Sequence, residues 1–278
     1  MDGKDVNHIT SYTDVVPSLL DLCKIEYNPT SPFEGESLVS LMKDPESSWK
    51  SRTIITDTQR KEFLVKWKDA SIMTDQYRLI RGEELYDFEK DPGQTTDIAA
   101  FNPEVVETLR NEYENWWARV SQRSDEINPI PVGFDEKAVT LTCHDIHADD
   151  NAMPAWNQTQ VRLNKNPNGF WIIDVKQKGK YSIAVHRYPV ESGAGFRAQV
   201  AVGDDIDGGK PYPLGMPIAV SKVKLKVGEV SLDQNIDADA KNAVFELELN
   251  PGEQELKTWL IDEDEKEVGA YYVYIQRI

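Results

Sequence analysis

The sequence predicts an α+β fold, in which a small antiparallel sheet with helices is followed by an all-β sandwich. Three observations support this prediction. The 278 residues exceed the roughly 100–200 of one domain. The spacing of apolar residues changes along the chain from helical periods to strict alternation. A polar, proline-containing segment, residues 125–131, separates the two patterns. We therefore expect one domain over residues 1–127 and a β-sandwich over residues 132–278.

The first domain is expected to hold three helices. Thr13 or Asp14 can cap a helix over residues 13–24, with Pro17 in its first turn. A short helix over residues 38–43 follows. The third helix is the clearest, because Asn102 and Pro103 form a typical start and apolar residues then recur every three or four positions to about residue 123.

Strands are expected between these helices and throughout the second domain. Five short apolar runs with polar turns predict a meander over residues 53–56, 63–67, 71–74, 77–80 and 84–88. In the second domain, runs such as Tyr181/Ile183/Val185 alternate with the period of two of half-buried strands. Nine candidate strands predict the sandwich: 139–142, 161–163, 170–175, 181–187, 197–202, 219–227, 244–249, 257–261 and 271–275.

Composition excludes several classes of protein. With 31 basic and 48 acidic residues, the net charge of −17 offers no basic footprint, so we expect no nucleic-acid partner and no membrane partner. No apolar run approaches the roughly 18 residues of a membrane span. Residues 1–8 lack the apolar region of a signal peptide. The two cysteines, Cys23 and Cys143, exclude a disulfide framework and a structural zinc site.

Few residues suggest chemistry on their own. Residues 143–150 combine a thiol, two imidazoles and carboxylates, which suits either a transition metal or a polar strand end. The acidic segments 204–208 and 233–239 suit either calcium or solvated loop tips. Four aromatic residues suit either sugar stacking or core packing, namely Trp156, Trp171, Tyr212 and Trp259.

Four ordered segments of the first domain resemble the C-terminal part of the arylsulfatase family. Residues 8–23, HITSYTDVVPSLLDLC, are similar to the family's "hIDllPTLLdLaGi" helix, and residues 33–38, FEGESL, to the segment that follows it. The runs YRLI, ELYD and DPGQ, at residues 77–80, 84–87 and 91–94, resemble "yrLI…ELYDlekDPgQ". Residues 102–117 match the closing helix. The second domain is more loosely similar to the β-sandwich extension of some bacterial sulfatases.

The resemblance implies an enzyme that hydrolyses sulfate esters. Family members use a formylglycine made from a C/S-x-P-S-R motif, with calcium and basic residues stabilising the sulfate. Neither Cys23 nor Cys143 begins such a motif, and no serine does. In family terms, the chain would begin after the catalytic core. We therefore expect no catalytic or metal-binding residue and no cofactor in this chain, with calcium implied only for the complete enzyme, and no sulfate-ester hydrolysis by the chain alone.

Six residues are predicted to contribute to a substrate cleft. Four of them lie on loops between predicted strands and combine polar, cationic and aromatic groups: Gln59, Arg60, Lys66 and Trp67. Such a combination suits a sulfated sugar, but it is also found in ordinary turns. His144 and Asp145 form a second pair at a strand end.

The expected function is thus the non-catalytic C-terminal part of a bacterial sulfatase acting on sulfated carbohydrate. Its expected partners are the sulfated carbohydrate or an aryl sulfate and a catalytic N-terminal domain, and the parent protein is expected to be periplasmic or secreted. The alternative is a self-standing β-sandwich that binds glycans or a protein partner.

Overall fold

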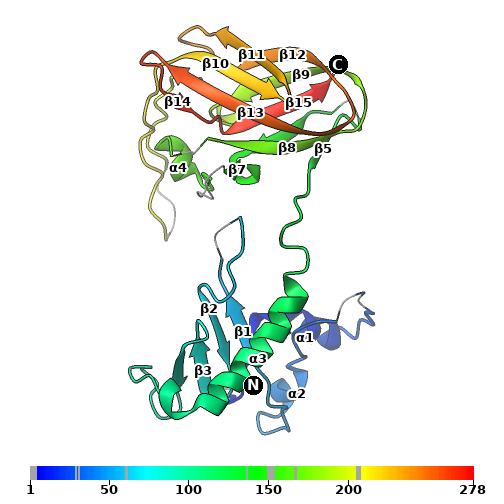
Figure 1. The fold of residues 1–278 in the computed structure, drawn as a ribbon, viewed down its shortest axis with the longest axis vertical. Coiled ribbons are helices and arrows are strands. Elements are labelled where there is room, and N and C mark those ends of the chain that lie inside the picture. Colours follow the sequence, from blue (N-terminus) through cyan, green and yellow to red (C-terminus); the bar gives the residue numbers. More distant parts are fainter. Residues whose placement is uncertain are drawn as a thin grey trace. The chain divides into compact units, whose positions relative to one another are not determined.

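The computed structural model describes residues 5–28, 30, 32–59, 62–135, 137–148, 154–165, 168–204 and 208–278. Its elements form a mixed helix and sheet fold that is mostly β. The chain divides into two compact units. One contains residues up to 59 and residues 64–124, and the other is built on residues 125–278. Figure 1 shows the elements of each unit.

The first unit is a four-stranded antiparallel meander with helices. The strands β1 (Ile54–Asp57), β2 (Ala70–Met73), β3 (Tyr77–Ile80) and β4 (Glu84–Asp87) pair in chain order. After the turn η2 (Ala99–Phe101), helix α3 (Pro103–Val120) packs on the sheet. The shared core is small and lies between helix and strands, with the buried residues Ala70, Ile72, Leu79, Leu85, Val106, Leu109 and Tyr113.

The N-terminal segment precedes this meander. Ser11 forms a capping box with Asp14 at the turn η1 (Tyr12–Asp14), which leads into α1 (Val15–Leu22). Asp14, one of the two residues predicted to cap this helix, is the N-cap residue of α1, but its side chain makes no capping hydrogen bond to α1. Helix α2 (Val39–Lys43) follows, and it buries Val39 and Leu41.

The predicted strand over residues 63–67 is wrong. Phe63, Leu64 and Val65 are exposed in a loop. Trp67 and Asp69 have φ values of 68° and 52°, in the left-handed region that interrupts a strand. The meander therefore has four strands in the described part of the chain.

The second unit consists of two sheets packed face to face. In one sheet the order is β11 (Val230–Asn235), β10 (Val220–Val227), β13 (Gly252–Asp262), β8 (Gly169–Val175) and β5 (Ile130–Val132), with β7 (His147–Ala148) beside β8 and β14 (Glu267–Val268) beside β13. The other sheet has the order β12 (Ala243–Leu249), β9 (Gly179–His186), β15 (Tyr272–Arg277) and β6 (Val139–Thr142).

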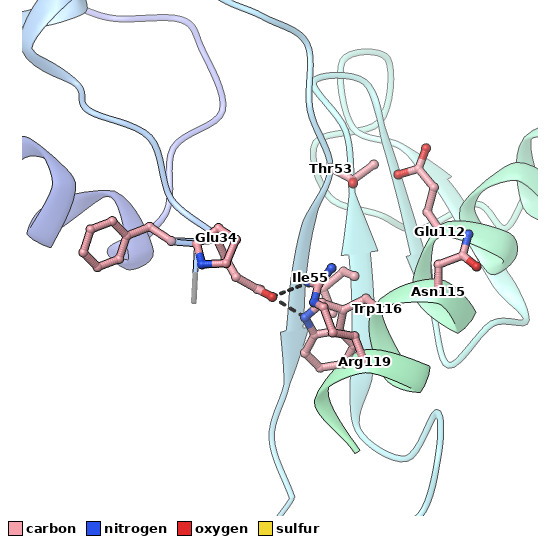
Figure 2. A pocket seen from close by; sticks show the side chains of 9 residues that line it. Glu34, Thr53, Ile55, Glu112, Asn115, Trp116 and Arg119 are labelled. Atoms are coloured by element: carbon pink, nitrogen blue, oxygen red, sulfur yellow. Dashed lines mark hydrogen bonds and ion pairs between the residues drawn. The ribbon is translucent and has the colours of Figure 1, made fainter. Parts of the chain in front are cut away.

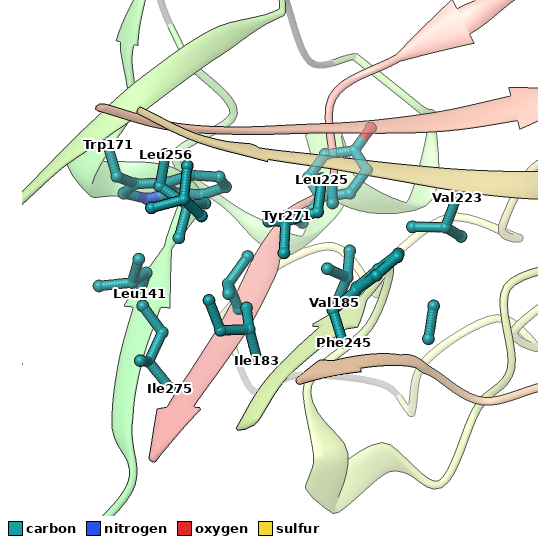
Figure 3. Close-up of a cluster of buried hydrophobic side chains, with 14 of the residues drawn as sticks. Leu141, Trp171, Ile183, Val185, Val223, Leu225, Phe245, Leu256, Tyr271 and Ile275 are labelled. Atoms are coloured by element: carbon teal, nitrogen blue, oxygen red, sulfur yellow. The ribbon is translucent and has the colours of Figure 1, made fainter. Parts of the chain in front are cut away.

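One apolar core lies between these two sheets. Figure 3 shows Trp171, Val223, Leu225 and Leu256 from the first sheet beside Leu141, Ile183, Val185, Phe245 and Ile275 from the second. The longer strands of the two sheets contribute alternate residues to this core. In β12, for example, Ala243, Phe245, Leu247 and Leu249 are buried while the residues between them are exposed.

Three predictions in this unit are wrong. Residues 161–163 end the helix α4 (Gln158–Arg162), because the Asn157 side chain accepts a hydrogen bond from the Gln160 backbone N–H at 3.0 Å and starts the helix. Residues 197–202 form no strand. Part of the segment expected to be a linker forms β5, which pairs in parallel with β8.

Buried Arg187 organises the long connection between β9 and β10. This connection includes the turn η4 (Val190–Ser192). The Arg187 guanidinium donates hydrogen bonds to the backbone carbonyls of Phe196, at 3.0 Å, and Met216. It also lies 4.7 Å from the centroid of the Tyr188 ring. The connection is therefore fixed by hydrogen bonds from the buried Arg187 guanidinium to its backbone carbonyls, and not by pairing with a strand.

Candidate functional site

The loop between β1 and β2 carries three of the described residues that were predicted to bind substrate. The Gln59 amide bridges the loop, because its Nε2 donates to the Val65 carbonyl at 2.9 Å and its Oε1 accepts from the Val65 N–H at 2.6 Å. Lys66 Nζ lies 2.6 Å from Glu114 Oε2 on α3. Arg60 lies outside the described residues. Gln59 and Lys66 thus use their polar groups to hold the loop.

Trp67 is packed against α3. Its ring stacks on Tyr113 with the centroids 3.6 Å apart, and its Nε1 donates to Glu114 Oε1 at 2.9 Å. The Tyr113 hydroxyl donates to Asp57 Oδ2 at 2.8 Å and accepts from the Trp67 N–H at 3.2 Å. Burial raises the pKa of Tyr113, so the hydroxyl stays protonated. Hydrogen bonds from Lys66 and Trp67 lower the pKa of Glu114.

The structure brings Lys66 and Trp67 together on Glu114 and gives both a structural task. Their role in binding a substrate stays a prediction. Sequence reasoning missed the contacts of Glu114 and Tyr113 with this loop. Their positions predict only that they lie on helix α3. Nothing in their spacing shows that the face meets a loop nearly fifty residues earlier in the chain.

A hollow of about 650 Å³ lies beside this helix (Figure 2). Glu34 reaches across it, accepts a hydrogen bond from Trp116 Nε1 at 3.1 Å and pairs with Arg119. The charge of Arg119 is therefore already neutralised by Glu34, and Glu112 adds a second carboxylate to the lining of the hollow. This composition does not favour an anionic ester. The lining residues are Pro32, Phe33, Glu34, Thr53, Ile55, Glu112, Asn115, Trp116 and Arg119.

Helix α1 buries a serine and exposes most of its apolar residues. Asp14, just before the helix, and Ser18 within it are buried. Val15, Val16, Leu19 and Leu22 are each half exposed or more. The Ser18 hydroxyl donates to the Asp14 carbonyl at 2.6 Å and accepts from the Leu38 N–H at 2.8 Å. The chain thus packs α1 through Ser18 and Asp14 and leaves these four apolar residues open.

The buried Asp14 is neutralised by Arg52. Asp14 Oδ1 accepts from Arg52 Nη1 at 2.8 Å and from the Glu36 N–H at 2.9 Å. Asp14 Oδ2 accepts from Arg52 Nη2 and from the Ser11 N–H, the latter at 2.7 Å. Burial alone would raise the pKa of Asp14, but the hydrogen bonds from Arg52 and the two backbone groups lower it overall. This bidentate pair fixes α1 with its apolar side outward.

The second unit places His144 and Asp145 at the end of β6, in the turn η3 (Cys143–Asp145). Asp145 caps this turn, because its Oδ2 accepts from the Thr142 N–H at 3.0 Å and from the Thr142 hydroxyl at 2.9 Å. His144 is exposed, and its Nε2 donates to the Trp156 carbonyl at 2.6 Å. Asp145 therefore serves the backbone, while His144 lines a hollow with Trp156.

This second hollow has a volume of about 420 Å³ and contains aromatic rings. Trp156 and Tyr212, two of the residues singled out in the sequence, are 45% and 38% exposed. The Arg162 guanidinium lies 5.4 Å from the centroid of the Tyr212 ring. Gln158 Nε2 donates to the Tyr272 hydroxyl at 2.8 Å. The lining residues are Thr142, Cys143, His144, Trp156, Asn157, Gln158, Val161, Tyr212 and Tyr272.

The remaining sequence candidates do not assemble into a reactive centre among the described residues. No group of three or more His, Cys, Asp or Glu side chains that could hold a metal ion occurs there. Residues 149 and 150, and 205–207, lie outside the described ranges. The pKa of Cys143 is raised by burial to about 11, so its thiol is protonated at neutral pH. Trp171 is fully buried in the core.

Comparison with known proteins gives no family. No protein-family model matches the chain, and no curated protein matches it. No helix in the described ranges combines the length and apolar character needed to cross a bilayer.

Several solved structures are similar to part of the chain. A ruminal GH26 endo-β-1,4-mannanase is 12% identical, with 52% of this chain and 27% of that protein covered at a TM-score of 0.28. A Bacillus subtilis protein is 12% identical, with 56% and 31% covered at a TM-score of 0.22. An exo-β-1,3-galactanase from Phanerochaete chrysosporium is 13% identical, with 50% and 26% covered at 0.22. The chain spans about a third or less of the length of these three proteins.

Proposed function

We propose that this chain is the non-catalytic C-terminal part of a sulfatase that acts on sulfated carbohydrate. The observation that carries the proposal is the orientation of α1. Its apolar residues Val15, Val16, Leu19 and Leu22 are exposed, while Asp14 and Ser18 are buried. An exposed apolar helix face of this kind is typical of a surface that another part of a protein covers. The segment that contains α1 is also the one that resembles the last helix of the sulfatase catalytic core.

The proposed role is structural support of a catalytic portion. The calcium that the family uses would be held by that portion, together with the formylglycine. In this chain, the Asp14–Arg52 pair would fix α1 for docking. The β1–β2 loop, held on α3 through Glu114, would present Gln59 and Lys66 near a substrate. The parent protein would be periplasmic or secreted, where sulfated polysaccharides are met.

The purified chain is expected to release no sulfate from nitrophenyl sulfate or from chondroitin sulfate, because it has no C/S-x-P-S-R motif. Release of inorganic sulfate is the measurement, with an active arylsulfatase assayed alongside as the control. Turnover above the buffer blank by the chain alone would show that it carries its own catalytic site.

The second candidate function is a β-sandwich that binds glycans without catalysis. The hollow with the exposed rings of Trp156 and Tyr212 favours it, because sugars stack on such rings. The DNA upstream of Met1 separates the two candidates. An in-frame segment with the C/S-x-P-S-R pattern would support the sulfatase proposal, and its absence would favour the binding module.

A further inference from the structure

A row of lysines lies on the outer face of the seven-stranded sheet. In β10, Val223, Leu225 and Val227 point into the core, so the alternating residues Lys222, Lys224 and Lys226 share the outer face. Alternate residues of a strand are roughly 7 Å apart, so the three side chains form a regular row. The strand β13 lies beside β10 (Figure 1). It adds Lys257, which is directly across from Lys226 in the register of the two strands. We call these four residues the lysine row.

The lysine row is unusual for so acidic a chain. Lys222 Nζ lies 3.9 Å from Asp233, and Lys257 Nζ lies 3.8 Å from Glu255. Lys224 and Lys226 form no ion pair with any residue in the described part of the chain, although acidic residues outnumber basic ones by 48 to 31. Lys226 and Lys257 face each other across the strands, and like charges in this position destabilise a sheet. Lys224 and Lys226 therefore carry positive charge that no ion pair within the described ranges neutralises.

Aromatic rings lie within the same face. Trp259 is the cross-strand neighbour of Lys224 and is partly exposed, and Lys224 Nζ lies 4.8 Å from its ring centroid. Phe170 on β8 is the neighbour of Lys257, whose Nζ lies 4.9 Å from that ring. The same face also carries carboxylates, because Asp233 on β11 lies across from Lys224, Glu255 shares the outer side of β13, and Glu267 on β14 lies across from Ile261. The face thus combines a row of cations with an aromatic platform.

We propose that the lysine row and Trp259 form a binding surface for an anionic polysaccharide. Such a polymer repeats a negative charge and an apolar ring face along its length, which matches a row of cations beside an indole ring. A nucleic acid fits less well, because the net charge of −17 leaves no larger basic footprint around the row. The surface goes beyond the proposed function and does not depend on it, since it requires no catalytic portion.

The test is binding of the full chain to dextran sulfate, with unmodified dextran as the matched ligand. The chain is expected to bind dextran sulfate and not dextran. The affinity is expected to fall steeply as salt rises from about 50 to about 200 mM. The variant K224E/K226E is expected to bind about tenfold more weakly or worse, and the neutral variant K224Q/K226Q to be intermediate. Hydrogen exchange of β10 and β13 checks that both variants are folded.

The control variant is K210E/K241E, which changes two exposed lysines of the same unit by the same charge. It is expected to bind like the unaltered chain. Equal weakening by the control variant would overturn the proposal, because it would show an effect of net charge alone. Failure to bind dextran sulfate would also overturn it. Equal, salt-insensitive binding to dextran would overturn it and favour the aromatic hollow at Trp156 instead. Equally tight binding to single-stranded DNA would refute a polysaccharide-specific surface. The sulfate-release assay is unaffected by all these outcomes, so the two proposals fail separately.

Discussion

Replacing Arg52 by alanine is expected to lower the free energy of unfolding of the N-terminal segment by about 3–5 kcal/mol. The substitution leaves the fully buried Asp14 carboxylate without its bidentate partner, and only the Ser11 and Glu36 N–H groups remain as donors. Hydrogen exchange resolved to peptides covering residues 9–22 is the measurement, because it reports this segment separately from the sandwich. A change of less than about 1 kcal/mol would show that the pair is not a structural anchor.

A matched control for this prediction is Arg119→Ala. Arg119 also pairs with a carboxylate, that of Glu34, but both side chains of that pair are well exposed. Its removal is therefore expected to cost about 1 kcal/mol or less. Arg52→Lys keeps the charge but not the two parallel hydrogen bonds, and is expected to fall between the two alanine variants.

Acid should remove the difference in the free energy of unfolding between the Arg52→Ala variant and the unaltered chain. Because the pKa of Asp14 is lowered in the folded chain, its stabilising contribution is present above the unfolded value of roughly 4. That contribution is lost as the pH falls through the lower folded value. The difference in stability should therefore be constant near neutral pH and shrink below about pH 4. A difference that stayed constant into acid would contradict the assignment of the charge to Asp14.

Replacing Trp171 by alanine is expected to lower the free energy of unfolding of the second unit by about 3–5 kcal/mol. Trp171 is 1% exposed and is the largest fully buried side chain. Its Nε1 donates to the Thr142 carbonyl at 2.8 Å, so the substitution both opens a cavity and leaves a carbonyl without its donor. Hydrogen exchange in β8 and β15 measures the loss.

Trp156→Ala is the matched control, because it removes the same side chain from the same unit at a site that is 45% exposed. It is expected to cost about 1 kcal/mol or less. Comparable losses in the two variants would mean that the core between the sheets is not where the stability of this unit resides.

The elements that the sequence predicted well are those with long periodic patterns. Helix α3 begins at Pro103, as predicted, although the Asn102 side chain does not cap it and instead donates to the Ile98 carbonyl at 3.0 Å. Strands β9 and β12 follow the alternation of Tyr181 and Phe245 with their neighbours, because a strand between a core and solvent must alternate.

The elements that the sequence missed are set by single local contacts. The run at residues 63–67 is apolar enough for a strand, but the stacking of Trp67 on Tyr113 and its positive φ keep it in a loop. The Asn157 cap turns residues near Val161 into a helix. Strand β11 looks like an acidic loop in sequence, yet Asp233 lies across from Lys224 in the sheet.

The candidate site was less predictable than the fold. Polar residue types in loops suggested Lys66 and His144, but their partners, Glu114 and the Trp156 carbonyl, are distant in sequence or part of the backbone. The Asp14–Arg52 pair spans 38 positions and has no local signal.

The most direct test of the central claim is the stability of the chain with Leu19→Glu and Leu22→Glu on α1. These side chains are 55% and 50% exposed, so the claim that they form a docking face predicts an unchanged free energy of unfolding, within about 0.5 kcal/mol, and weaker binding of a hydrophobic dye. Leu41→Glu on α2, where the leucine is buried, is the control that should unfold the segment. A loss of several kcal/mol in the α1 variant would contradict the claim, because it would show that this face already packs within the chain.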